Sequence, residues 1–577
     1  MHNFGNLEGV RRKSRWLVGA AAAAVASTWG VLPAAAADDA QIQQLQTLIQ
    51  RLQTQYASDI KQLQDQLNQL KAQQAQQAQQ PAQPVIQDLQ NQITQLKAQQ
   101  AQTQAQVQEQ APPAGTPRLI ASPTHQFGFT SADGANSVAI AARLMIDGAD
   151  YFHTVPQGGP AKGAGPGGTG GPLDSGVNAR RARLGIQGTF ENDWAYRLIY
   201  DFGSSADSTT PGVSGAVTSG VENAYVTYNG FYKQTNFLPV AIDLGYLDIP
   251  WTLDESTSSN DIMFLERSSA QVVATEFGGG DFRSGFGLRS NNQRYWAGVY
   301  LTGNTSGTPH TGANIGNYSV LGRAGYQVYQ GDDNATVHLG VNGAHLFNAR
   351  SNSTATAATS ITDVATNANL ALSDRPELRV DPTVLLNTGN IAINSGQVGG
   401  VEAAGTLGNF FVQGEYYAYE VSQRPGGTNP ADGAVNKVAP DLNFQGGYVE
   451  ASYSIGGHRR YIAETGAYSG VIPDAPFALD KGNPGAFELA VRYSTIDLND
   501  KWTFGQAPHL TGGVNGGNQR GLDLGINWYP SINLKFMLDY VHTDVSDLYK
   551  ASTGGAVQTT PTGATINAIA IRSQFLF

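Results

Sequence analysis

The sequence predicts an all-β transmembrane fold, a closed antiparallel β-barrel, preceded by an α-helical coiled coil. Three observations carry the barrel prediction. From about Val138 to Phe577, about 16 to 18 segments alternate apolar and polar side chains. The second face of these segments is charged, and many of the loops between them are long.

The composition supports a wall of strands more than an ordinary packed domain. The 577 residues include 68 Gly, 24 Tyr and 22 Phe, and only 14% are charged. The absence of Cys excludes thiolate metal sites and cysteine nucleophiles. The net charge of −11 disfavours nucleic acid as a partner.

The N-terminus has the pattern of an export signal, residues 1–37. Four basic residues, Arg11 to Arg15, precede an apolar run that ends in a small-residue cleavage pattern at Ala35 and Ala37. A retained membrane anchor is the alternative, but the run is short and rich in Ala. Cleavage would remove four basic residues and one acidic residue, which changes the net charge from −11 to −14.

Residues 38–110 are rich in Gln and Ala and predict a coiled coil. Apolar residues at alternating steps of three and four form a heptad seam, which runs from Ile42 to Leu70 and resumes at Ile86. A solvated low-complexity linker is the alternative beyond Gln73. Residues 111–124 break every periodicity and read as a linker, so the barrel domain is expected at 125–577.

Strand length and polarity favour a membrane barrel over a soluble sandwich or propeller. The alternating segments have about the nine to eleven residues needed to cross a bilayer at a tilt. No window of this region has the apolar length of a transmembrane helix. A tight turn such as "FENDW" contrasts with long Gly- and Ser-rich loops such as 148–179, which is the asymmetry of outer-membrane barrels.

The alternation assigns the polar face of each strand to the lumen. In "VAIAARLMID", Val138 and Ile140 face lipid, so Arg143 and Asp147 face inward. The same argument gives the candidate lumenal cations Arg143, Arg181, Arg183, Arg197, Arg323, Arg492, Lys535 and Arg572. Guanidinium groups hold oxyanions and stay charged, so this set predicts a path for anions.

A structural role for these cations is the competing interpretation. Lumenal Arg often pairs with carboxylates to tie the wall together, for example Arg197 with Asp201 or Lys535 with Asp539. No sequence pattern supports catalysis, a cofactor or a metal site, and no G-x-S-x-G motif is present. An outer-membrane barrel enzyme remains the less favoured alternative.

Several stretches together resemble one family. "RRARLGIQGTFENDWAYRLIYDFG", "GAFELAVRYSTIDLND", "GINWYPSINLKFMLDYVHTDV" and the terminal "RSQFLF" are similar to the phosphate-selective porin O and P family of Gram-negative outer membranes. The resemblance covers about 125–577. It implies a 16-stranded antiparallel outer-membrane β-barrel, a homotrimer in outer-membrane lipid, and an N-terminal coiled coil in the periplasm. Contact of this coiled coil with peptidoglycan is a separate hypothesis.

The resemblance also implies a site. An inward-folded third loop would form the constriction, here 250–267, with Arg181 and Arg183 in an arginine ladder. The constriction candidates are Asp254, Glu255, Glu266 and Arg267, and the segment has no Lys, a departure from the family's lysine cluster. We therefore expect a porin for small hydrophilic solutes, preferentially anions such as phosphate. The alternative is a weakly selective general porin with a cell-wall-tethering stalk.

Overall fold

The computed structural model describes residues 117–120, 127–157, 173–203, 220–234, 239–277, 282–305, 318–347, 369–503, 505–546 and 563–577. The predicted signal peptide (1–37) and coiled coil (38–110) lie outside the described residues, as does most of the 111–124 linker. Gly115–Ile120 and Thr124–Phe577 belong to one compact unit. Among the described residues, no helix combines the length and the apolarity needed to cross a bilayer.

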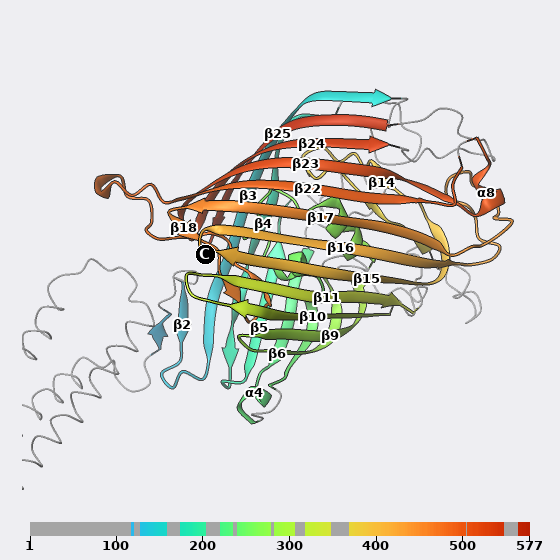
Figure 1. The fold of residues 1–577 in the computed structure, drawn as a ribbon. Coiled ribbons are helices and arrows are strands. Elements are labelled where there is room, and N and C mark those ends of the chain that lie inside the picture. The colour runs from blue at the N-terminus through green and yellow to red at the C-terminus, as the bar shows by residue number, and fades with distance from the viewer. Residues whose placement is uncertain are drawn as a thin grey trace, which may run out of the picture. The chain divides into compact units, whose positions relative to one another are not determined.

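Within the described residues, sixteen strands pair in antiparallel order around a closed barrel (Figure 1). The last strand pairs with the first, which leaves the wall without the open edge that lipid could not satisfy. The prediction of a 16-stranded barrel is confirmed. The strands are β3 (Ser137–Gln157), β4 (Gly176–Phe190), β5 (Trp194–Asp201), β6 (Gly220–Tyr228), β7 (Ala241–Asp248), β8 (Phe282–Asn291), β9 (Tyr295–Thr305), β10 (Ser319–Gln330), β11 (Thr336–Leu346), β15 (Ile391–Leu407), β16 (Phe410–Gln423), β17 (Leu442–Ile455), β22 (Ala486–Asp500), β23 (Val514–Ser531), β24 (Leu534–Ser546) and β25 (Gly563–Leu576).

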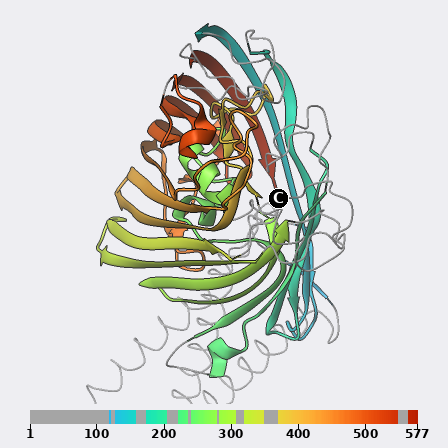
Figure 2. The same cartoon turned by 90° about the vertical axis from the view of Figure 1, so that its right-hand side faces the viewer.

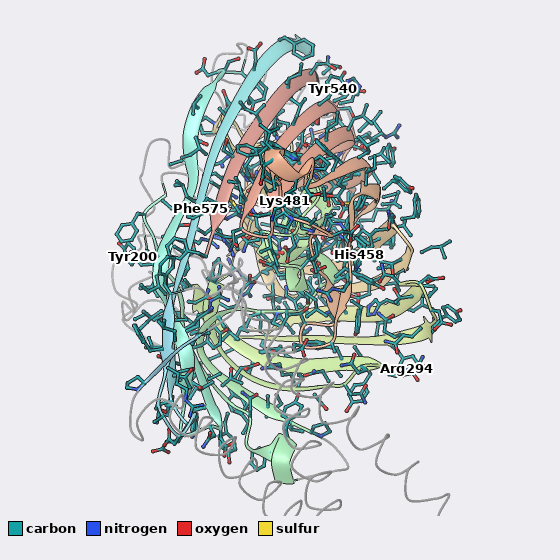
Figure 3. All side chains as sticks on the ribbon, turned by 90° about the vertical axis from the view of Figure 1, so that its left-hand side faces the viewer. Tyr200, Arg294, His458, Lys481, Tyr540 and Phe575 are labelled. Carbon is teal, nitrogen blue, oxygen red and sulfur yellow. The ribbon has the colours of Figure 1, made fainter. Side chains whose placement is uncertain are left out.

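The faces of the wall follow the alternation. The apolar side chains of β3 assigned to lipid, Val138 through Ile146, are 36–44% exposed. On β25, Ile571 and Phe575 are exposed, whereas Arg572 and Gln574 are buried. Tyr200 of β5 points away from the barrel (Figure 3). The inward set is therefore the polar one.

One end of the barrel carries mostly tight turns. The turn between β4 and β5 has Glu191 and Asn192 both in the left-handed region, with φ of 51° and 64°. Asp333 and Asn334 do the same between β10 and β11. Two consecutive residues of positive φ match the twist of a two-stranded hairpin.

The C-terminus completes the pairing of β3. The main chain of Phe577 exchanges hydrogen bonds with that of Ala142, at 2.8 and 3.1 Å. Where β25 stops, β2 (Gly128–Thr130) continues beside β3, and β1 (Arg118–Leu119) pairs with β2. The ring of Phe127 meets that of Phe577 edge-on at 5.3 Å.

Three connections between barrel strands carry short elements of their own. The constriction loop (residues 249–277) holds α5 (Leu253–Ser256) and α6 (Ser269–Phe277), and Figure 2 shows these green segments inside the ring of strands. The second inserted loop (residues 369–390) carries β12 (Asn369–Leu370), β13 (Ser373–Asp374) and β14 (Leu386–Asn387). The long turn (residues 456–485), at the tight-turn end, contains β18 (Gly457–His458), β19 (Tyr461–Ile462), β20 (Ala467–Tyr468), β21 (Ile472–Pro473) and η1 (Leu479–Lys481).

The remaining helices are short. These are α4 (Phe231–Gln234) after β6 and α8 (Pro508–Thr511) before β23.

Candidate pore and its constriction

The constriction loop begins at a capped helical turn held by the wall. The Thr252 hydroxyl accepts a hydrogen bond from the Glu255 main-chain N–H at 3.0 Å, which caps α5. Two further main-chain N–H groups, of Leu253 and Asp254, donate to the Glu415 carboxylate of β16 at 2.8 and 2.9 Å. A buried wall carboxylate thus fixes the direction in which the loop enters the lumen.

The middle of the loop is extended, and wall side chains take its main-chain groups. Four main-chain carbonyls of this segment accept hydrogen bonds from wall side chains. Lys535 Nζ donates to the Ile262 carbonyl at 2.6 Å, and Asn527 donates to the Met263 carbonyl at 2.8 Å. Arg572 donates to the Leu265 carbonyl, and Arg492 donates to the Glu266 carbonyl at 2.7 Å. The Leu265 N–H donates to Asp539 at 2.7 Å. These partners lie on β22, β23, β24 and β25. One side of the barrel therefore provides the main-chain hydrogen bonds of a segment that has no secondary structure of its own.

Glu266 binds arginines from two strands of the wall, β4 and β25. Arg180 donates to both of its oxygens, at 2.6 and 2.9 Å, and Arg572 donates to Oε1 at 2.9 Å. Arg572 also forms a bidentate pair with Asp147, at 2.6 and 2.7 Å. Burial alone would raise the pKa of Glu266, but the charges of Arg180 and Arg572 outweigh it and hold the pKa below its ordinary value.

The end of the constriction loop contacts the second inserted loop. The Ser269 N–H at the start of α6 donates to Glu377 at 3.0 Å, and Glu377 in turn accepts from Arg492 at 2.9 Å. Glu276, near the end of α6, accepts from the Ser373 N–H at 2.8 Å. Burial raises the pKa of Glu276 well above its ordinary value, and the nearby Asp374 adds to the shift.

The structure brings most of the predicted lumenal cations into contact with carboxylates or carbonyls. Arg183 pairs with Asp201 at 2.8 Å and Glu222 at 3.1 Å, and Arg323 pairs with Glu402 at 2.9 Å. The two predicted ion pairs were wrong. Asp201 pairs with Arg183 instead of Arg197, and Lys535 donates to the Ile262 carbonyl instead of pairing with Asp539. Arg492, Lys535 and Arg572 hold the constriction loop, as described above.

Two of the candidates, Arg143 and Arg197, lie half-buried beside an open cavity. Arg143 donates to the Ser259 hydroxyl of the constriction loop at 2.6 Å. Arg181 is buried, and its Nη1 lies 3.5 Å from the Met145 sulfur. The cavity, called here the vestibule, measures about 1040 Å³. It is lined by β3 to β9, by β23 to β25, by the constriction loop and by the long turn.

The predicted constriction residues all lie in the constriction loop. Most of them contact the loop itself or the barrel wall instead of lining the vestibule. Arg267 donates to the carbonyls of Asp254 and Thr257, at 2.9 and 2.8 Å, and lies 3.6 and 3.7 Å from the carboxylates of Asp254 and Glu255. Of these candidates, Glu255 lines the vestibule. Burial raises the pKa of Asp254, against the opposing charge of Arg267.

The family model of phosphate-selective porin O and P matches residues 168–577. The chain belongs to this family. Porin O of Pseudomonas aeruginosa is 24% identical over 365 residues, 63% of this chain and 75% of that protein. An uncharacterized protein of Caulobacter vibrioides is 26% identical over 377 residues, 64% of this chain and 63% of that protein, so the match spans less than two thirds of the latter.

Solved structures with a similar fold include two outer-membrane proteins. OmpT of Vibrio cholerae has a TM-score of 0.40 and 11% identity, over 77% of this chain and all of that one. The outer membrane channel DcaP of Acinetobacter baumannii has a TM-score of 0.41 and 12% identity, over 78% of this chain and all of that one.

As a member of the porin O and P family with a closed barrel, the protein is an outer-membrane channel for solute diffusion. In such barrels the tight turns face the periplasm and the long loops face outward. The long turn is an exception to the expected short periplasmic turns. It folds against the wall, where Trp296 Nε1 donates to the Glu464 carbonyl at 3.1 Å and Arg323 donates to the Gly466 carbonyl at 2.6 Å.

The long turn also reaches the constriction loop. Arg459 forms a bidentate pair with Glu488 of β22, at 2.6 and 3.0 Å, and donates to the Asp261 carbonyl at 2.8 Å. The sequence offered no signal for this contact because the turn has no sustained alternation. Only the fold places residue 459 next to residue 261.

Sequence reasoning missed three further cations near Glu266, namely Arg180, Arg375 and Arg379. Arg180 was not among the predicted lumenal cations. A register shift between Met145 and Ile146 leaves it as an extra residue of β4, and Arg180 and Arg181 are both buried inside the barrel. Arg375 and Arg379 come from the second inserted loop, where no alternation assigns a face. In the sequence, only the adjacent pair Arg180 and Arg181 suggested a concentration of positive charge here.

These residues form the outer cation cluster: Arg180, Arg181, Arg375, Arg379 and Arg572, around Glu266. Arg379 pairs with Asp374 at 2.7 Å and lies 4.0 Å from Glu266. Among the described residues, Arg375 has no carboxylate within ion-pair distance, and its buried Nε has no acceptor. Burial and then the charge of Arg379 lower the pKa of Arg375 to about 10, so the cluster carries positive charge that the protein does not fully compensate.

Proposed function

We propose that this porin favours small hydrophilic anions, oxyanions such as phosphate among them, which diffuse passively through the barrel. The observation that carries the proposal is the outer cation cluster. Arg375 is half-buried, has no described carboxylate within ion-pair distance and lies beside four further guanidinium groups, so this uncompensated positive charge can attract a passing oxyanion. The charged candidates Arg143 and Arg197 would continue this path into the vestibule.

A weakly selective general porin is the second candidate, and the vestibule favours it. Its described lining includes the cations Arg143, Arg183, Arg197, Arg289 and Lys535 and the carboxylates Glu222, Asp243, Asp248, Glu255, Asp261 and Glu464. The two signs nearly balance, so this part of the path would discriminate little between anions and cations. Selectivity would then depend on the outer cation cluster.

Reversal potentials in a salt gradient test the proposal. The protein in planar bilayers is expected to pass chloride more readily than potassium, and Arg375→Glu is expected to shift the permeability ratio toward potassium. A change of two charge units at roughly 8 Å in a water-filled pore is worth about 1 kcal/mol, or about fivefold. Phosphate competing with chloride for the pore would identify the oxyanion preference.

Arg294→Glu is the matched control, because Arg294 is exposed in the turn between β8 and β9 and makes the same charge change outside the cluster. Equal shifts from both variants would contradict a role for the outer cation cluster. Cation selectivity of the unmodified channel would contradict the anion proposal altogether.

We further propose a homotrimer with residues 38–110 as a periplasmic coiled coil that contacts peptidoglycan. The heptad seam and the family resemblance support this proposal. Deletion of residues 38–110 is expected to leave conductance unchanged while detergent-solubilised protein loses its pull-down with purified peptidoglycan. Conductance that falls with the deletion, or unchanged peptidoglycan binding, would contradict a separate tether.

A further inference from the structure

The long turn ends in a hairpin that projects from the strands at the left of Figure 1, where it is drawn in orange. This hairpin, called the tip, comprises residues 475–484 and contains η1. It is closed by paired main-chain hydrogen bonds between Ala478 and Asn483, both 3.0 Å. Gly482 ends η1 in the left-handed region, at φ 68°. Lys481 of the tip is labelled in Figure 3.

Both ends of the tip are fixed to the end of β23. The Phe477 N–H donates to the Pro530 carbonyl at 2.7 Å. The Trp528 indole N–H donates to the Pro484 carbonyl at 2.8 Å. The base of the tip is therefore held at the end of β23.

The tip presents large apolar side chains to its surroundings. Leu479 is 84% exposed and Phe477 is 46% exposed. The Phe477 ring meets the Trp528 ring edge-on at 5.5 Å. Trp528 in turn stacks on Phe487 at 6.2 Å and Phe536 at 5.5 Å, so Phe477 joins an existing aromatic group.

This aromatic group lies on the lipid side of the wall. Trp528 follows Leu522, Leu524 and Ile526 on the exposed face of β23, at the end where the tight turns lie. Aromatic rings at the ends of barrel strands sit at the membrane interface. Because the tip continues this group outward, the medium next to Phe477 is the same interface.

We propose that the tip is a membrane-interface anchor, in which Phe477 and Leu479 insert among phospholipids of the periplasmic leaflet. Apolar side chains beside a polar backbone and a lysine are the composition of interfacial segments. The anchor would fix the depth and tilt of the barrel through a segment that does not cross the membrane. This inference does not depend on the selectivity of the pore.

A single labelled cysteine tests the proposal, since the chain contains no Cys of its own. Leu479→Cys, labelled with a bimane fluorophore, is reconstituted as the full chain in vesicles of dioleoyl phosphatidylcholine or its dibrominated form. We expect brominated lipid to quench the label at least twofold, as it does at the lipid-facing control Ile526→Cys. Lys481→Cys, in the same tip, is expected to be quenched less by lipid and more by aqueous iodide.

Two outcomes would overturn the proposal. Quenching of the Leu479→Cys label by iodide but not by brominated lipid would place the tip in water. Disulfide-linked dimers of unlabelled Leu479→Cys, with no lipid quenching of the label, would assign the tip to a contact between two copies of the chain. Because Leu479 is exposed, the substitution is expected to leave conductance unchanged, which verifies a folded barrel in each sample.

Discussion

Replacing Glu266 with Gln is expected to destabilise the barrel by about 3–5 kcal/mol and to raise its conductance. The substitution keeps the size of the side chain but removes the negative charge that Arg180 and Arg572 share. Removing one partner of a buried ion pair leaves the other charge uncompensated, which costs this amount. Arg180 would then repel Arg379 and Arg572, and the constriction loop would lose its support from β4 and β25.

The measurements are the free energy of unfolding, from urea titration in lipid vesicles, and single-channel conductance. The pH dependence provides a second test. The pKa of Glu266 is lowered in the folded protein, so its contribution is present above the unfolded pKa of about 4.3 and is lost as the pH falls through the lower folded pKa. The difference in the free energy of unfolding between Glu266→Gln and the native protein should therefore shrink at acid pH, because the native carboxylate also becomes neutral there.

Glu276→Gln is the matched control, because it makes the same change at a second buried glutamate of the same loop. The pKa of Glu276 is raised, so the native protein loses stability as the pH rises above the unfolded value of about 4.3. Gln at this position is expected to be neutral or stabilising at pH 7. If the two variants lost equal stability, the cation contacts of Glu266 would not be the cause.

Replacing Arg492 with Met is the second large effect, an expected loss of at least about 3–5 kcal/mol. Arg492 donates to Asp523 at 2.8 Å, to Glu377 at 2.9 Å and to the Glu266 carbonyl at 2.7 Å. Its guanidinium also lies 4.6 Å from the centre of the Phe264 ring. Met fills much of the volume but leaves two buried carboxylates facing each other without this cation.

The yield of folded barrel in vesicles, resolved by its altered gel mobility before heating, measures this effect. Arg289→Met provides the control, because the Arg289 side chain is 21% exposed and pairs with Asp243 at 3.0 Å. The Asp243 that remains still accepts hydrogen bonds from Thr227 and Tyr300, at 2.6 and 3.0 Å, so we expect a loss of about 1 kcal/mol. A comparable loss of folded barrel in both variants would contradict a special role for Arg492 in holding the two inserted loops.

These two residues show where prediction from sequence was adequate. Arg492 was assigned to the lumen because strand side chains alternate with a period of two, and the barrel wall preserves that period along β22. The partners of Arg492 were not predicted. Its partner Glu377 is 115 residues away in sequence, and alternation carries no information on what a lumenal side chain meets.

Arg180 and Glu266 show where prediction from sequence failed. One extra residue in β4 opposite Met145 turned Arg180 inward, and a bulge leaves no mark on the hydrophobic pattern. Glu266 was placed in the constriction loop by resemblance, and its function as a shared partner of Arg180 and Arg572 followed only from the closed barrel.

The sequence by itself determined the barrel, the face of most strand residues and the charged lumen, because each depends on local periodicity. The tertiary structure decided which cations stay available to a solute. Most of the predicted lumenal cations are occupied by the constriction loop or by carboxylates of neighbouring strands. Arg375 comes from a loop without any periodicity, and no carboxylate among the described residues lies within ion-pair distance of it. Charge compensation depends on distances of a few ångströms between segments remote in sequence, and only the folded chain fixes these distances.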